Sequence, residues 1–333
     1  MIGRRMRTPL GKAGLVFFAA MLAAESLSAQ EKKDPPAGAG LPSLKFSGYA
    51  QIFGVDWDKG TDSFSVRRAR VGLAGEIVKN LRFKLSVDVA KSPTLLDAEI
   101  EFAPNAIAGV RFGQFRVPFS LESFTSTADI DMIDRSSVVD ALAPGRDNSA
   151  SGRDAGAVLF GGSSCLEYAV GFFNGAGINR TDTDGHKDFG GRIVLRPFGF
   201  LAIGGSLYRG RQTVVIDEPL VARNKEGLEA VLSIKGFALK GEYIHARDDL
   251  VSKSGWYAQA GYFALPKKVQ ALVRYDSLDL DRAVPGNGTN VISFGVNWFI
   301  AGRTKLQLNY EIHRLEAGGR EEAGLLAQFQ AAF

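Results

Sequence analysis

Residues 118–154 read PFSLESFTSTADIDMIDRSSVVDALAPGRDNSASGRD. After the N-terminal segment, this is the only long interval in which apolar and polar residues do not alternate. It holds two helix-like pieces, at residues 120–128 and 136–142, and its seven carboxylates outnumber its three arginines. An interval this long in a compact β-structure is uncommon and usually functional or disordered. If the flanking strands close into a barrel, we expect this segment to fold inside it as a constriction loop.

On both sides of this interval the sequence alternates with a period of two, as a strand does when its faces differ in polarity. Residues 81–89, LRFKLSVDV, place leucine, phenylalanine and valine on one face and arginine, lysine, serine and aspartate on the other. The pattern recurs as far as the terminal Phe333 and gives about sixteen strands of ~8–12 residues, long enough to cross a bilayer when tilted. We therefore predict an all-β fold, a transmembrane antiparallel β-barrel over residues 44–333.

The connections between these strands are alternately short and long. The short ones are at residues 78–80, 161–164, 197–199, 235–236, 265–268 and 301–303, and the longer ones are at residues 118–154, 174–187, 211–226, 247–254 and 279–290. Outer-membrane barrels have tight periplasmic turns and longer outer loops, so the alternation favours a barrel over a soluble sandwich. A cylinder of sixteen strands with a polar interior is wide enough for a water-filled channel.

The N-terminus has the features of a secretory signal peptide. Four basic residues among the first twelve precede an apolar run at residues 13–24 and the small-residue stretch SLSA at residues 26–29. The run is too short to span ~30 Å of hydrocarbon. We expect a signal peptide at residues 1–29, with cleavage after Ala29 or Ser28, and a flexible periplasmic leader at residues 30–43.

The charge and cysteine content exclude two classes of interpretation. The net charge of +4 comes largely from the signal peptide, so the rest of the chain gives no reason to expect nucleic-acid binding. Cys165 is the single cysteine, so no intrachain disulfide is possible.

Several stretches resemble one family, the phosphate-selective porins O and P. They are SVRRARVGL at residues 65–73 with Gly75, Asp97 with Ala98, GQFRVPFS at residues 113–120 with Glu122, RDAG at residues 153–156 running to Gly161, FFNG at residues 172–175, and the terminal Phe333. The resemblance is dense over residues 46–175 and only architectural afterwards.

The resemblance implies a trimeric porin of the bacterial outer membrane whose third outer loop folds inward. Basic side chains would line the path and favour anions such as phosphate; Arg68 and Arg70 match the arginine-rich strand, and Arg153 matches the arginine after the inward loop. This chain departs from the pattern, because the loop is net acidic and an acidic row follows on the strand at residues 97–101.

The polar alternate positions supply the candidate pore-lining residues. The basic ones are Arg68, Arg70, Arg82, Lys84, Arg111, Arg153, Arg192 and Arg196, and the acidic ones are Asp97, Glu99, Glu101, Glu122, Asp129, Asp131 and Asp134. A ladder of arginine and lysine selects anions in a pore. Alternatively, the cations pair with carboxylates of adjacent strands, which holds the wall together and gives a mixed-charge lumen. A preference for cations is the third possibility.

Three aspartates of the loop, Asp129, Asp131 and Asp134, are open to two interpretations. They suit helix caps or a divalent cation, but their spacing lacks the glycine and distal glutamate of a calcium loop. We therefore expect lumen-facing carboxylates, and neither a metal nor a cofactor. No catalytic motif is present, and His186, His245 and His313 lie in separate segments, which leaves a barrel lipase with a serine beside His313 as a minor alternative.

The sequence therefore predicts a porin for passive diffusion of small hydrophilic solutes, with phosphate or other anions implied by the resemblance. A substrate-specific channel for an organic anion or oligomer is the first alternative, and a barrel serving as a scaffold or surface enzyme is the second. Expected partners are outer-membrane lipid, the solutes, further copies in a homotrimer, and the barrel assembly machinery through Phe333.

Overall fold

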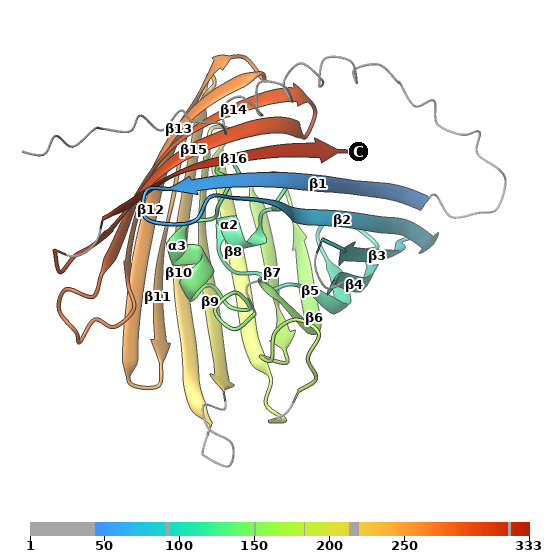
Figure 1. Cartoon of the computed structure of the whole chain (residues 1–333). Coiled ribbons are helices and arrows are strands. Elements are labelled where there is room, and N and C mark those ends of the chain that lie inside the picture. Colours follow the sequence, from blue (N-terminus) through green and yellow to red (C-terminus); the bar gives the residue numbers. More distant parts are fainter. Residues whose placement is uncertain (1–43, 91–93, 150, 183, 213–219, 319–320) are drawn as a thin grey trace, which may run out of the picture. The chain divides into compact units, whose positions relative to one another are not determined.

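A computed structural model describes residues 44–90, 94–149, 151–182, 184–212, 220–318 and 321–333. The expected signal peptide and periplasmic leader, residues 1–29 and 30–43, lie outside the described residues. Figure 1 shows the chain from Leu44 onward as one curved sheet that surrounds two short helices. No helix among the described residues is long and apolar enough to cross a membrane.

The described residues form sixteen strands that close into a barrel, as the alternation predicts. The first eight strands are β1 (Leu44–Trp57), β2 (Ser63–Val78), β3 (Leu81–Asp88), β4 (Thr94–Phe102), β5 (Gly109–Arg116), β6 (Arg153–Gly162), β7 (Leu166–Phe173) and β8 (Asp188–Phe198). The others are β9 (Leu201–Gln212), β10 (Val221–Ile234), β11 (Phe237–Asp248), β12 (Val251–Leu265), β13 (Val269–Asp279), β14 (Thr289–Ala301), β15 (Thr304–Leu315) and β16 (Glu322–Ala332).

The barrel closes because β1 pairs on both of its edges. Its antiparallel register with β16 runs from Tyr49 opposite Ala332 to Trp57 opposite Gly324, and every other strand pairs with its neighbours in sequence. Closure leaves no free sheet edge, which a membrane-spanning sheet requires because hydrocarbon offers no hydrogen-bond partners.

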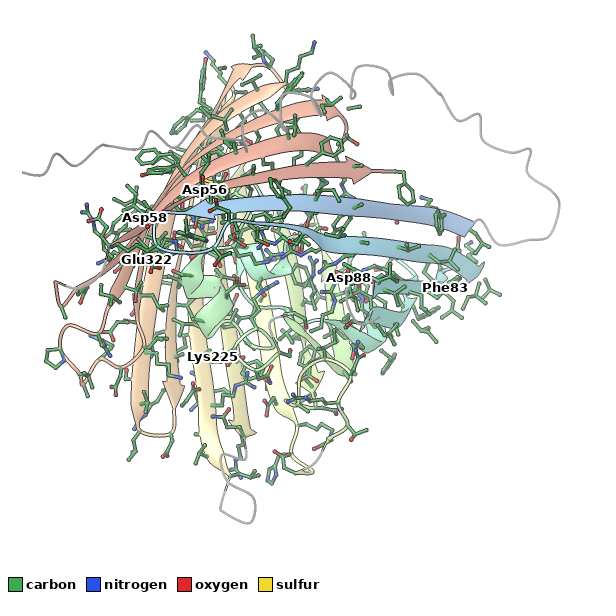
Figure 2. The ribbon with its side chains drawn as sticks, viewed as in Figure 1. Asp56, Asp58, Phe83, Asp88, Lys225 and Glu322 are labelled. Atoms are coloured by element: carbon green, nitrogen blue, oxygen red, sulfur yellow. The ribbon has the colours of Figure 1, made fainter. Side chains whose placement is uncertain are left out.

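The two faces of the wall differ in polarity as lipid and water demand. Outward positions carry exposed apolar residues such as Phe112, Leu228 and Phe294, whereas inward positions carry polar residues such as Gln259 and Asn297. Figure 2 draws the side chains of the described residues on both sides of the ribbon. The barrel is apolar outside and polar inside, which is the arrangement of outer-membrane proteins.

Short and long connections alternate around most of the two rims. The turn between β10 and β11 is Lys235-Gly236, whose positive φ angles of 47° and 84° suit a tight hairpin. The expected longer connection at residues 247–254 is wrong, because β11 ends at Asp248 and β12 starts at Val251. Both strands continue beyond the apolar band, where polar outward residues face water and keep the strand period.

The segment between β5 and β6 turns into the barrel and carries two short helices, α2 (Leu121–Phe124) and α3 (Ser137–Leu142). Ser120 and Ser136 cap them, each accepting a backbone N–H bond of 3.2 Å through its hydroxyl. Apolar residues of this segment pack with inward apolar residues of the wall: Val117, Phe119, Val138, Val139 and Leu142 against Phe115, Phe173, Ile244 and Tyr257. We call residues 117–152 the constriction loop.

Candidate pore constriction

The constriction loop is anchored to the wall at the start of α2. The carboxylate of Glu242, on β11, accepts the backbone N–H groups of Leu121 and Glu122 at 2.8 Å each and the hydroxyl of Tyr257 at 2.8 Å. A carboxylate at a helix N-terminus satisfies donors that the helix itself leaves unpaired. The sequence pattern did not indicate Glu242, because nothing in a strand signals a contact with a distant loop.

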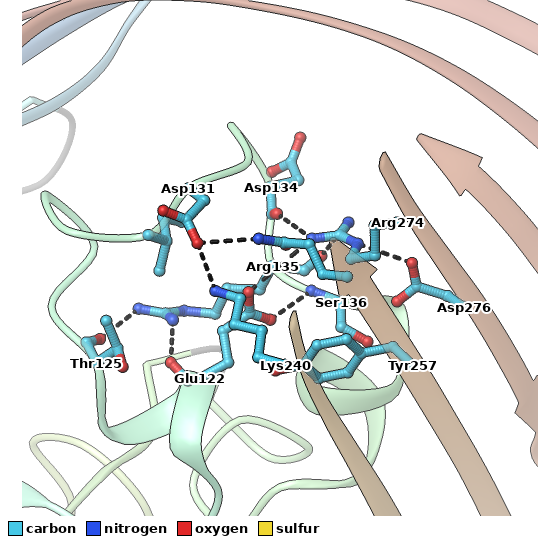
Figure 3. A network of polar contacts seen from close by, with 12 residues as sticks. Glu122, Thr125, Asp131, Asp134, Arg135, Ser136, Lys240, Tyr257, Arg274 and Asp276 are labelled. Carbon is cyan, nitrogen blue, oxygen red and sulfur yellow. Dashed lines mark hydrogen bonds and ion pairs between the residues drawn. The ribbon is translucent and has the colours of Figure 1, made fainter. Parts of the chain in front are cut away.

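A second anchor centres on Arg274 of β13 (Figure 3). Its guanidinium donates to the backbone oxygen of Asp134 at 2.9 Å and to the Asp276 carboxylate at 2.8 Å. Glu122 lies 3.9 Å away and accepts the Ser136 N–H at 2.7 Å. Glu122 is thus buried between loop and wall, and differs from its prediction as a lumen-facing carboxylate because it links α2 to the start of α3.

Each of the three loop aspartates predicted to face the lumen lies beside a cation from the wall. Asp129 pairs with Arg303 at 2.7 Å, Asp131 with Lys240 at 2.8 Å, and Asp134 with Arg67. Their partners come from β2, from β11 and from the turn between β14 and β15. No group of carboxylates among the described residues is arranged to hold a metal ion. The net acidic charge of the loop therefore serves to attach it to a basic wall.

Asp131 shows how strongly the wall acts on the loop. Burial raises the pKa of Asp131, but the ammonium groups of Lys240 and Lys305 outweigh it, so the pKa of this carboxyl lies below its ordinary value. The Lys305 ammonium also donates to the Ile130 backbone oxygen at 2.8 Å. The Asp131 side chain is therefore negatively charged at neutral pH.

A β-bulge directs Arg67 inward. The register between β1 and β2 shifts at Gln51, where Arg68 and Val66 occupy successive pairing positions and Arg67 is left over. The guanidinium of Arg67 lies over the Phe53 ring at 4.7 Å and contacts Asp134. Strict alternation would have placed Arg67 with the outward residues, which is why it is absent from the predicted pore-lining set.

The predicted cations on β2 to β6 mostly pair with carboxylates. Asp97 is shared by Arg153 at 2.7 Å and Lys84 at 3.0 Å. The remaining pairs are Arg70 with Asp88 at 2.8 Å, Arg82 with Glu101 at 2.7 Å, Arg111 with Glu101 at 2.7 Å, Arg111 with Glu99 at 3.5 Å, and Lys84 with Glu99 at 3.6 Å. Arg153 reaches from β6 past β5 to Asp97 of β4, and the other contacts match the alternative in which adjacent strands exchange ion pairs.

The predicted cations on β8 have partners outside the acidic row. Arg192 holds Glu229 of β10 through two hydrogen bonds, at 2.9 and 2.5 Å, and Arg196 pairs with Glu167 at 2.8 Å. A bidentate arginine–carboxylate contact fixes the guanidinium in one orientation. Arg192 is buried in this contact, whereas Arg196 and Glu167 stay exposed to water.

Arg68 and Arg116 have no carboxylate partner among the described residues. Arg68 donates to the Gln51 side chain at 2.9 Å. Arg116, the last residue of β5, donates to the Phe124 backbone oxygen at 2.7 Å. Arg116 was not among the predicted pore-lining residues, because it follows the inward Phe115 and alternation assigns it to the outer face. The chain turns into the barrel at this residue, and its side chain turns with it.

A cavity of about 410 Å³ lies between the constriction loop and the inner wall of β1 to β6. Six cationic side chains and two carboxylates line it: Arg70, Lys84, Arg111, Arg116, Arg153 and Arg303 against Asp97 and Glu99. Ser126 and Phe124 of the loop also face this cavity. The excess of cations gives it a positive field despite the ion pairs in its wall.

Comparison with solved structures identifies the architecture. The anion-selective porin of Comamonas acidovorans superimposes with a TM-score of 0.70 at 15% identity, covering 88% of this chain and 100% of that one. OmpT of Vibrio cholerae in its trimer form gives 0.64 at 11%, covering 88% and 100%. DcaP, an outer membrane channel of Acinetobacter baumannii, gives 0.63 at 12%, covering 87% and 97%. At these identities the likeness establishes the fold alone.

The sequence comparison establishes the family. The model of phosphate-selective porin O and P matches residues 46–192 and 213–328, which is most of the chain. No curated protein matches the chain significantly. With the closed sixteen-strand barrel, these findings place the protein in the bacterial outer membrane and confirm the predicted porin. The chain is therefore an outer-membrane porin, a member of the phosphate-selective porin O and P family.

Proposed function

We propose that this porin lets small hydrophilic solutes diffuse across the outer membrane with a preference for anions. The cavity beneath the constriction loop carries the proposal, since six cations face two carboxylates there. Arg116 strengthens it, because a cation without a carboxylate partner leaves a positive field that an incoming anion meets. A pore lined mainly by arginine and lysine selects anions. Phosphate is the anion that the family name indicates, and it fits this lining.

Planar lipid bilayers with a KCl gradient test the preference. The two ions differ little in mobility, so the sign of the reversal potential reports the selectivity of the pore. We expect the sign that corresponds to chloride permeation. A potential of the opposite sign would falsify the anion preference, and the absence of any conductance would favour the alternative of a scaffold.

We also propose that the porin is a homotrimer in which the wall from β3 to β7 faces the other copies. These strands hold 8 to 10 residues, whereas the others hold 11 to 16. Eight residues rise about 20 Å along the membrane normal at the usual tilt, less than the ~25 Å apolar band. The structural neighbour in trimer form supports the same assembly.

Polar groups on the outer side of this low wall agree with a protein partner. Gln114, two residues beyond the outward Phe112, donates to the backbone oxygens of Leu95 and Leu96 at 2.9 and 3.0 Å. It also accepts the N–H of Asn179, from the β7–β8 loop, at 2.7 Å. Burying polar groups such as those of Gln114 and Asn179 against lipid tails costs free energy, whereas polar groups are common in contacts between protein copies.

A pair of matched double variants tests the contact face. Phe112→Ala with Ile100→Ala truncates the low wall, and Phe294→Ala with Ile203→Ala removes the same atoms from the outer face of β14 and β9. Each truncation costs about 2–5 kcal/mol where the side chain is buried between copies. We expect only the first variant to yield monomers in mild detergent, measured by light scattering after size exclusion. Equal effects of both would place the contact elsewhere.

A further inference from the structure

A second lumen cavity, of about 580 Å³, lies between the constriction loop and the inner wall of β5 to β8. Its volume is in the range of sites for small organic molecules. Part of its lining is apolar: the phenyl rings of Phe124 and Phe160, with Pro118 and Ala169 beside them. Phe124 and Pro118 come from the loop, and Phe160 and Ala169 from the wall.

Each of the two rings carries a guanidinium at its face. The Arg111 Cζ lies 4.8 Å from the centre of the Phe160 ring, and the Arg192 Cζ lies 5.5 Å from that of Phe124. Both arginines are fixed by carboxylates of the wall, Glu101 and Glu229. The cavity thus presents ordered cation–π pairs, beside which a further aromatic ring stacks favourably.

The same cavity contains one guanidinium that is open to exchange. Arg196 lines it, and its partner Glu167 is also at the surface; their side chains are 42% and 43% exposed. An exposed ion pair of this kind contributes at most about 1 kcal/mol. A carboxylate arriving from solution therefore displaces Glu167 at little cost and accepts the hydrogen bond that Arg196 now donates to Glu167.

We propose that this cavity binds aromatic carboxylates of benzoate size, with the ring between Phe124 and Phe160 and the carboxylate on Arg196. Inorganic phosphate has no apolar surface to pack on the walls of this cavity, and an uncharged aromatic molecule forms no ion pair with the Arg196 guanidinium. The inference rests on the proposed conduction of anions and adds a binding site for one chemical class. A channel with such a site saturates with its solute, whereas simple diffusion does not.

The test measures chloride current through the full-length porin in planar bilayers while sodium benzoate, sodium acetate or benzyl alcohol is added. We expect benzoate to reduce the current in a saturable manner at much lower concentration than acetate or benzyl alcohol. Phe160→Ala is expected to raise the half-blocking concentration of benzoate about tenfold, through lost stacking and contact area. Arg196→Gln is expected to raise it as well.

Phe53→Ala is the matched control, since Phe53 is also an inward phenylalanine under a guanidinium but lies on β1. It is expected to leave block by benzoate unchanged. Equal potency of benzoate and acetate on an anion-selective wild-type pore overturns the site alone, and so does an equal loss in both phenylalanine variants. A cation-selective wild-type pore overturns the proposed conduction whatever benzoate does. Retained heat-modifiable mobility on gels verifies folding of each variant.

Discussion

Replacement of Arg274 by leucine is expected to release the constriction loop and raise the single-channel conductance. The Arg274 side chain is 2% exposed, and it holds the loop through the backbone oxygens of Asp134 and Arg135 while it compensates Asp276. Its removal leaves Asp276 buried without its ion-pair partner, which costs about 3–5 kcal/mol. The barrel keeps its sixteen pairings, so the loop and not the wall gives way.

Conductance and proteolysis together distinguish this outcome from a general loss of structure. We expect larger and noisier open currents, and cleavage within residues 117–152 by a protease that leaves the natural porin intact. Arg274→Lys keeps the charge but not the three-point contact, so its conductance and its cleavage should lie between those of the natural porin and of Arg274→Leu. Arg274→Leu with Asp276→Leu removes the unpaired Asp276 carboxylate as well, and should restore part of the loop's protection against the protease. Unchanged conductance in Arg274→Leu would show that the loop is held by other contacts.

The strands were predictable because lipid on one side and water on the other enforce a period of two. The β3 strand matches its predicted range within one residue. The same reasoning failed between β11 and β12, where a longer connection was predicted at residues 247–254. Beyond the apolar band both faces of a strand meet water, so polarity no longer separates strand from connection.

The bulge at Arg67 is visible in the sequence as a change in which positions are apolar, which a strictly alternating pattern does not take into account. Outward apolar residues fall on even positions at Phe64 and Val66 and on odd positions at Ala69 and Val71. A change of parity within one strand indicates one extra residue. This signal was sufficient to place both Arg67 and Arg68 in the lumen, where Arg67 contacts Asp134.

The anchors of the constriction loop had no such signal. Arg274 and Glu242 occupy inward positions of their strands, more than a hundred residues from the loop residues that they contact, and their alternation is the same as that of any lumen residue. Their contacts depend on how the loop folds in three dimensions. Ion pairs between adjacent strands were easier, because register places Lys84 directly opposite Glu99 and Arg111 opposite Glu101.

Reversal of two charges in the cavity beneath the loop is expected to change the sign of the selectivity. Lys84 and Arg303 both line this cavity and both remain open to water, with side chains 48% and 61% exposed. Lys84→Glu with Arg303→Glu converts a lining of six cations and two carboxylates into an even balance. Asp129 then loses its partner and adds a free carboxylate, so the local field becomes negative.

The reversal potential under a KCl gradient measures this change, and we expect it to cross from the anion side to the cation side. Lys59→Glu with Arg314→Glu changes the charge equally at the outer rim, where both side chains are exposed. Salt screens charges that lie more than about 10 Å from the path at 0.1 M, so this control should keep the natural sign. If both variants shift the potential equally, total charge and not the lining of this cavity sets the selectivity. The anion preference is a property of the cavity only if the two variants differ.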